Sequence, residues 1–359
     1  MPQDKNNPAV VSDLPSRKAP FYKEVIRIVI IFVLALALPL FIESSTIGDL
    51  SYFLLWTFCG IGLAAMWGHA GILSFGQSAF FGLAGYAYGV LTVNFGDAAL
   101  VTWAGLAGSL VITGLFAALL GYMIFYGRVT GIFIGIITLS VTLVFETFMA
   151  QTAGPQWKIG AARLNGYNGM SGMPPLSLPW FDGGQIILEG EAFYYLLIVL
   201  LAMVYLGTQY MLRSTFGLTL MAIKENPQRA EMLGIDIRKY QLLIFTFGGI
   251  LAGLSGTLYT VWGSYITPSS MGLTAAAMPV IWVAAAGRKN IGAVVVTTIS
   301  FVWLSQWLAV YGSEYALILM GAVLLFVILA APEGVFAWGL SLVKKKDQPV
   351  ALTSQEPIK

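Results

Sequence analysis

Apolar segments of helical length, separated by short polar stretches, recur along the whole chain. A membrane-spanning helix needs roughly 20 mainly apolar residues. The segments that approach this length are Val25 to Ile42, Leu50 to Trp67, Gln77 to Val93, Ala98 to Phe125, Gly131 to Ala150, Ala192 to Leu212, Tyr240 to Trp262, Met271 to Ala286, Ile291 to Tyr311 and Tyr315 to Ala331. The pattern predicts an all-α, polytopic transmembrane bundle of about ten spans, eight at the fewest.

The eighth segment, Met271 to Ala286, differs from the others because it is short and contains Pro279. A proline removes a backbone hydrogen bond from the interior of a helix. The segment is therefore either a plain span or a re-entrant or broken helix, which is tolerated where its backbone is buried against neighbouring helices. The number of spans depends on this choice.

Polar stretches divide the chain into parts. Residues 1–24 are polar and rich in proline, a composition typical of a mobile arm. The first apolar run has no small-residue cleavage site beyond it, so we expect an anchor rather than a removed signal peptide. A transmembrane domain then fills residues 25–331, with a turn-rich outer loop at 151–191 and a charged insert at 213–239. Residues 332–359 are expected to form a cytoplasmic tail.

The composition fits a lipid environment and excludes several kinds of chemistry. Hydrophobic residues make up 58% of the chain, charged residues only 10%, and the mean hydropathy is +0.80. Cys59 and His69 are the sole residues of their types, which excludes a disulfide framework and a Cys/His metal site. The net charge of +2 is spread over the loops and does not indicate nucleic-acid binding.

The distribution of Lys and Arg predicts the orientation, because basic residues are retained on the cytoplasmic side. With ten spans and the N-terminus inside, every Lys and Arg except Lys158 and Arg163 lies on the inner side. The outer side instead holds acidic residues, namely Glu43, Asp49, Asp97, Asp182, Glu189, Glu191 and Glu314. We therefore expect both termini in the cytoplasm.

The insert carries the signals of two short helices. Asn226 followed by Pro227 is typical of an N-cap and a first helical position, and Gly234 stands where a left-handed residue ends a helix. These signals predict a short capped helix from Pro227 to Leu233.

An apolar stripe precedes this helix, because Phe216, Leu220 and Ile223 recur at helical spacing. Such a stripe at the cytoplasmic face fits a groove of another protein. Alternatively, it lies on the lipid headgroups or packs beneath the bundle. Spacing alone leaves both interpretations open.

A longer set of residues in the insert is distinctive in type and order: Arg213, Phe216 and Gly217, then Ala222, Ile223, Glu225 and Asn226, then Ala230, Leu233, Gly234 and Ile235. This set resembles the coupling loop of the branched-chain amino acid permeases of ABC importers, the Liv-type membrane subunits. The stretch Gly71 to Tyr86 is similar to the signature of that family around its early spans. The stretch Ala331 to Gly334 is similar to the exit of its terminal helix. The resemblance covers roughly Trp67 to Gly334.

The resemblance implies a permease subunit of a bacterial inner membrane that imports branched-chain or other small amino acids. Its implied partners are a second homologous permease, two cytoplasmic ABC ATPases, an extracytoplasmic solute-binding protein and the lipid bilayer. The chain has no G-x-x-x-x-G-K-[ST] motif for nucleotide phosphates. ATP and Mg are therefore expected on the partner ATPases, with no cofactor and no catalysis on this chain. The residues expected to couple to the ATPase are Arg213, Phe216, Gly217, Ala222, Glu225, Asn226, Leu233 and Gly234.

Small polar residues interrupt the apolar pattern after Gly68, among them Ser74, Gln77 and Ser78. Non-helical backbone at membrane depth must be buried or line a cavity. A broken helix here would offer its N–H groups and positive end to a substrate carboxylate. Alternatively, the glycines of this stretch only allow close packing of helices.

Glu146 is the acid within the predicted spans, and Thr142 and Thr147 flank it. A carboxyl group in lipid is costly and is a functional candidate. Three roles are open for Glu146. It lines the transport path together with Thr142, it carries a proton, or it is a structural carboxyl group that bonds to threonine or to loop backbone. Its position near the outer end of its helix suits a structural carboxyl group as well as a residue that lines the path.

Two departures from the family pattern leave the substrate open. Residues 159–163 replace a Thr-Gly-Gly segment before Asn165, and the glycine-rich break after the eighth span is reduced to residues 287–289. A permease for urea or a short amide is therefore an alternative. The alternative of another class is a secondary transporter or channel that uses Glu146. An intramembrane enzyme would lack a suitable base or nucleophile.

Overall fold

The computed structural model describes residues 21–180, 184–311, 321–322 and 325. The chain divides into a short unit, residues 1–43, and a large unit, residues 44–359. In the short unit, the described residues form helix α1 (Phe21–Ala37) and a short 3₁₀-helix, η2 (Leu38–Leu40). Helix α1 corresponds to most of the first predicted span.

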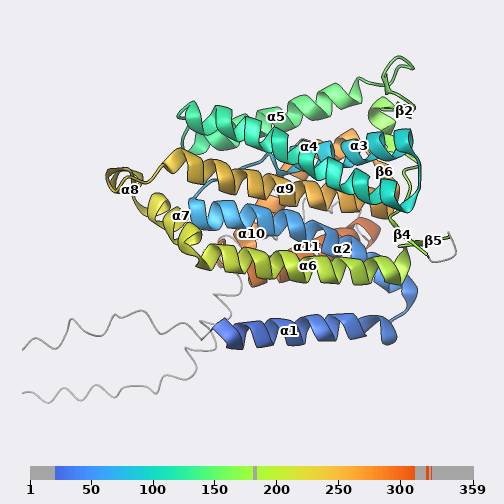
Figure 1. Ribbon diagram of the computed structural model, residues 1–359, viewed down its shortest axis with the longest axis horizontal. Coiled ribbons are helices and arrows are strands. Elements are labelled where there is room, and N and C mark those ends of the chain that lie inside the picture. Colours follow the sequence, from blue (N-terminus) through green and yellow to red (C-terminus); the bar gives the residue numbers. More distant parts are fainter. Residues whose placement is uncertain (1–20, 181–183, 312–320, 323–324, 326–359) are drawn as a thin grey trace, which may run out of the picture. The chain divides into compact units, whose positions relative to one another are not determined.

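The large unit is a bundle of helices (Figure 1). Its helices are α2 (Ser44–Ala64), continued by the π-helix η3 (Ala65–Ala70), then α3 (Gln77–Phe95), α4 (Ala99–Tyr126), α5 (Ile132–Ala150), η4 (Gly166–Asn168), α6 (Gly190–Arg213), α7 (Thr215–Glu225), α8 (Pro227–Met232), α9 (Ile237–Gly263), η5 (Pro268–Met271), α10 (Leu273–Ala286) and α11 (Ile291–Tyr311). Helices α7 and α8 form the predicted insert.

Six described helices are long and apolar enough to cross a membrane: α2 with η3, α4, α5, α6, α9 and α11. Helix α10 and the apolar part of α1 are shorter. The predicted spans up to the ninth each coincide with a helix, which confirms a mainly helical bundle of membrane type. Most of the tenth, Tyr315 to Ala331, lies outside the described residues, as do most of the predicted arm, the stretch Ala331 to Gly334 and the tail.

Helix α9 packs against α2, α3 and α4. Small residues allow this close approach. A side chain at Gly249 would meet Ala117 of α4, and one at Gly253 would meet Thr113 of the same helix. At Gly256, added atoms would collide with the backbone of Phe81 in α3. These glycines therefore serve the packing of the bundle.

Short strands gather at one end of the large unit, which we call the strand end (Figure 1). They pair in antiparallel fashion: β1 (Lys158–Ile159) with β2 (Ala162–Arg163), β3 (Met170–Ser171) with β6 (Tyr265–Ile266), and β4 (Ser177–Pro179) with β5 (Gln185–Ile187). Most of them belong to the predicted turn-rich loop. The pair β3–β6 ties this loop to the chain that follows α9.

The opposite end, which we call the insert end, holds α7, α8, the turn 127–131 between α4 and α5, and the turn 287–290 between α10 and α11. Its basic residues are Arg128, Arg213, Lys224, Arg229, Arg238, Lys239, Arg288 and Lys289. The segments at the strand end contain the basic residues Lys158 and Arg163 and the acidic residues Asp97, Glu189 and Glu191. The two ends of the large unit therefore differ in charge, as the sequence predicts.

Candidate functional site

Helix α8 begins and ends as its sequence predicts. The side chain of Asn226 accepts a hydrogen bond from the backbone N–H of Arg229 at 2.9 Å, and Pro227 is the first helical residue. Beyond the end of the helix, Gly234 adopts a φ of +80°. The N–H of Ile235 then returns to the carbonyl oxygen of Ala230 at 3.2 Å. This C-cap turns the chain back toward α9.

The apolar stripe of α7 faces the bundle. Leu220 and Ile223 are buried, and the ring of Phe216 stacks on that of Tyr240 in α9, with 5.5 Å between the ring centroids. Of the two interpretations that the spacing leaves open, the structure supports packing beneath the bundle. The chain itself covers Leu220 and Ile223, so these two side chains are not available to a groove of another protein.

A different face of the insert is exposed. On α7, Leu218, Ala222 and Glu225 follow one another at intervals of four and three residues and share one side of the helix. On and after α8, Met232 is 88% exposed and Leu233 is 76% exposed. We call these five residues the exposed face of the insert. Leu218 and Met232 were absent from the sequence prediction, although both lie out of phase with the buried stripe.

Most of the other predicted coupling residues determine the shape of the insert. A side chain at Gly217 would collide with the backbone carbonyl of Leu212, so the sharp turn from α6 into α7 requires glycine. Asn226 and Gly234 cap α8 at its two ends. Arg213 is exposed and ends α6. The structure thus brings the predicted residues together in one compact element.

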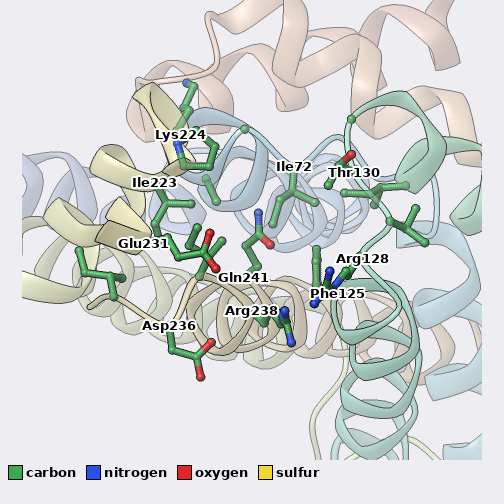
Figure 2. A pocket seen from close by; sticks show the side chains of 18 of the residues that line it. Ile72, Phe125, Arg128, Thr130, Ile223, Lys224, Glu231, Asp236, Arg238 and Gln241 are labelled. Atoms are coloured by element: carbon green, nitrogen blue, oxygen red, sulfur yellow. The ribbon is translucent and has the colours of Figure 1, made fainter. Parts of the chain in front are cut away.

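A recess of about 830 Å³ opens between the insert and the turn that joins α4 to α5. Figure 2 shows Ile223 and Lys224 of α7 on one side of it, and Phe125 and Arg128 across from them. Ile72, from the chain that follows η3, also lines the recess. The insert is therefore bordered by open space on this side.

Between η3 and α3 the chain is not helical, as the sequence predicts for this glycine-rich stretch. Helix η3 ends at Gly71, whose φ is +74°, and we call residues 72–76 the strap. The N–H of Phe75 donates to Oγ1 of Thr138 at 3.1 Å, and Oγ1 of Thr142 donates to the carbonyl oxygen of Phe75 at 3.2 Å. Both threonines belong to α5.

The depth of these bonds explains why they are needed. With a rise of about 1.5 Å per residue, Thr138 and Thr142 lie roughly 9 and 15 Å along α5 from its start at the insert end. Backbone groups that are not in a helix must find partners at such depth. The two threonine hydroxyls supply them for Phe75. Thr142 was predicted to line the path, whereas Thr138 had no distinguishing signal in the sequence.

Helix α3 begins directly after the strap. Oγ of Ser74 accepts the N–H of Gly76 at 3.1 Å, and no side chain caps the first turn of α3. Gln77 and Ser78 are buried. Among the described residues, neither polar atom of the Gln77 amide has a hydrogen-bond partner, and the Ser78 hydroxyl has none either. Three unpaired polar atoms at one helix start are unusual in a protein interior.

Glu146 lies apart from these residues, toward the strand end of α5. Its Oε1 is 2.8 Å from the position that a Cβ atom would take at Gly272, the N-cap of α10. A carboxylate is favourable at the amino end of a helix. The geometry therefore favours a structural role for this carboxyl group.

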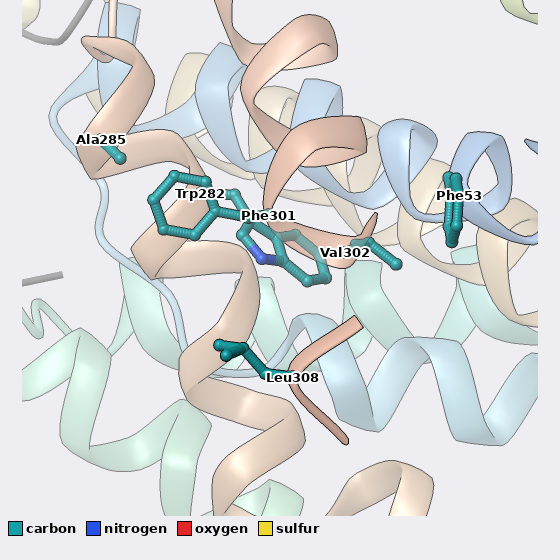
Figure 3. Close-up of a cluster of buried hydrophobic side chains, with 6 residues drawn as sticks. All are labelled: Phe53, Trp282, Ala285, Phe301, Val302 and Leu308. Carbon is teal, nitrogen blue, oxygen red and sulfur yellow. The ribbon is translucent and has the colours of Figure 1, made fainter. Parts of the chain in front are cut away.

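Helix α10 joins the two ends of the large unit. It starts beside Glu146 and ends before Arg288, whose backbone oxygen lies against Gly68 at the insert end. Trp282 and Ala285 of α10 pack with Phe53 of α2 and with residues of α11 in the buried cluster that Figure 3 shows. The predicted eighth segment is thus a short helix of 14 residues with Pro279 inside it.

Comparison with known proteins gives a consistent result. A family profile described as "Branched-chain amino acid transport system / permease component" matches residues 45–328. The high-affinity branched-chain amino acid transport system permease protein LivM of Escherichia coli (strain K12) is 23% identical over 93% of this chain and 80% of its own length. LivM of Salmonella typhimurium (strain LT2) is 22% identical over 89% of this chain and 77% of its own.

A more distant relative is the probable branched-chain amino acid transport permease protein LivM of Methanocaldococcus jannaschii, 24% identical over 48% of this chain and 52% of its own length. No solved structure gave a significant match.

Proposed function

The chain belongs to the family of branched-chain amino acid transport permeases, and from this premise we propose that it is the membrane subunit of an ATP-driven importer of branched-chain amino acids. The observation that carries the proposal is the insert. It is a compact, capped pair of helices that exposes Leu218, Met232 and Leu233 at the basic end of the bundle. Exposed apolar side chains of one compact element support a contact with another protein, because exposed apolar patches mark such contact sites.

We assign the exposed face of the insert to the ATPase. Two ATPase subunits, a second permease and a solute-binding protein complete the importer in this proposal, and ATP and Mg belong to the ATPases. Because basic residues gather at the insert end, we place that end in the cytoplasm of a bacterial cell, at the inner membrane. The solute-binding protein then approaches from the strand end.

We place the substrate near the start of α3. An amino acid carries a carboxylate, which suits the N–H groups and the positive pole of a helix start. The unpaired amide of Gln77 and hydroxyl of Ser78 are the polar groups available there. The strap that leads to this point is held by hydrogen bonds to two threonine side chains, so its position can change without breaking a helix. Ser74 supports the same turn through its bond to Gly76.

Reconstitution tests the proposal directly. The chain is inserted into proteoliposomes with its candidate partner permease, ATPases and binding protein, and uptake of labelled leucine, urea and a short amide is measured with and without ATP. We expect uptake of leucine that requires ATP, the ATPases and the loaded binding protein. Removal of any of these should reduce uptake to the level of empty liposomes.

Two results would change the assignment. Uptake by this chain alone, without ATP, would sink the importer and favour a secondary transporter or channel. Uptake of urea but not leucine would keep the importer and correct its substrate. A Glu146→Gln variant separates the mechanisms further. If this variant loses only the uptake that an imposed proton gradient drives, the result would point to a proton-coupled carrier.

A further inference from the structure

The end of α2 meets the insert through the side chain of Lys224. Its Nζ donates a hydrogen bond to the carbonyl oxygen of Gly68 at 2.7 Å. Gly68 belongs to η3, the last turn before the strap. The final carbonyl groups of a helix have no partners within it, and they form the negative pole of the helix dipole. A lysine from another helix therefore completes the end of α2.

Close packing surrounds this bond. A Cβ atom at Gly71 would lie 3.2 Å from Cγ of Lys224, so the lysine stem lies directly against the glycine that precedes the strap. A side chain at Gly68 would collide with the backbone oxygen of Arg288 in the α10–α11 turn. Helix η3 is thus held between Lys224 on one side and this turn on the other. The guanidinium of Arg288 lies over the ring of Trp67, 4.9 Å from its centroid.

Lys224 holds this position against an electrostatic cost. Burial lowers the pKa of its amine, and the positive charges of Lys289 and Arg288 lower the pKa further. A lysine without such a contact would extend into water, where its charge is best solvated. The hydrogen bond to Gly68 therefore holds the Lys224 cation at η3 although two like charges lie nearby.

We propose that Lys224 is the positioning residue that transmits movement of the insert to the strap, an inference that rests on the proposed function. Lys224 joins α7 to η3, and Phe75 joins the strap to Thr138 and Thr142 of α5. The recess beside the insert provides the space in which α7 can move. When the ATPase displaces α7, the bond to Gly68 draws η3 and the strap with it. The start of α3 is then rearranged in step with ATP hydrolysis.

The test uses the complete reconstituted importer. Lys224→Met keeps most of the lysine stem but has no N–H donor or charge, and Lys224→Arg keeps both. ATP hydrolysis and leucine uptake are measured in the same vesicles. For Lys224→Met we expect unchanged hydrolysis and about tenfold less leucine taken up per ATP, the size of an ordinary coupling free energy. Lys224→Arg should restore most of the uptake.

Lys239→Met is the matched control, because Lys239 is an exposed lysine at the same end of the large unit, the insert end. It should leave uptake per ATP unchanged. The proposal is overturned if Lys224→Met transports as much leucine per ATP as the unaltered chain. It is also overturned if that variant loses its ATPase on purification, since Lys224 would then serve assembly. An unaltered importer without ATP-dependent uptake would instead defeat the proposed function itself.

Discussion

Gly234 shows how one backbone angle sets the shape of the insert. Its φ of +80° is open to glycine but costs an alanine about 1–2 kcal/mol, although no atom would obstruct a Cβ there. In Gly234→Ala we therefore expect amide hydrogen exchange in residues 227–235 to speed up by roughly 5- to 30-fold, measured by mass spectrometry. Gly207→Ala is the control, because Gly207 lies in α6 with equally open space. Equal exchange in both variants would contradict this account.

Thr138 is one of the two threonines that hold the strap. Its hydroxyl donates to the carbonyl of Ile134 and accepts the N–H of Phe75. Thr138→Val preserves the shape but leaves that N–H unpaired, so we expect the free energy of unfolding to fall by about 1–3 kcal/mol. The measurement is denaturant unfolding in detergent, with Thr138→Ser expected to remain close to the unaltered chain.

Ser140 provides the comparison for Thr138 on the same helix. Its hydroxyl bonds to the carbonyl of Ile136 one turn earlier, but its side chain is exposed. Ser140→Ala should therefore change stability little. If Ser140→Ala and Thr138→Val destabilise the protein equally, the bond within the helix explains the loss and the strap does not.

At the scale of the helix, the two faces of the insert have separate tasks. Leu220 and Ile223 attach α7 to the bundle, whereas Met232 stands in open space. A charge placed at the centre of an apolar contact must be desolvated on binding. We expect Met232→Asp to weaken retention of the ATPase by at least about tenfold, measured by co-purification at several detergent and salt conditions.

Leu178 at the strand end is the matched position, since it is an exposed leucine on the opposite side of the bundle. Leu178→Asp should retain the ATPase as the unaltered chain does. Retention that is equally weak in both variants would show a general loss of folding. If Met232→Asp retains the ATPase fully, the exposed face of the insert is not the contact with the ATPase.

The sequence predicted elements well and their partners poorly. Helix ends follow from local chemistry, such as Asn226 and Pro227 before α8, and the structure has these ends. The apolar period on α7 identified a buried face but could not say whether the bundle or a partner covers it. The bond of Phe75 to Thr138 joins residues 63 positions apart, and no spacing rule connects them. The bond of Lys224 to Gly68 joins residues 156 positions apart, and no spacing rule connects these either.

Across the large unit, charge and architecture agree. The helices α2, α4, α9 and α11 span the distance between a basic end and an end of short paired strands. A chain inserted by the usual rule keeps its basic end in the cytoplasm. In the proposed importer, the exposed face of the insert, Lys224 and the start of the strap then lie on the side where ATP is present, and the strand end faces the incoming solute. The proposed coupling to an ATPase therefore depends on this orientation of the molecule in the membrane.

Accessibility of single cysteines tests that orientation. Cys59 is buried, so a Cys59→Ala background can receive Met232→Cys at the insert end or Tyr167→Cys at the strand end, both at highly exposed positions. The chain is produced without its ATPase, which would otherwise cover Met232. A membrane-impermeant maleimide should label Tyr167→Cys in spheroplasts and Met232→Cys only after the membrane is opened. The reverse pattern would invert the topology and place the exposed face of the insert beyond the reach of any cytoplasmic ATPase.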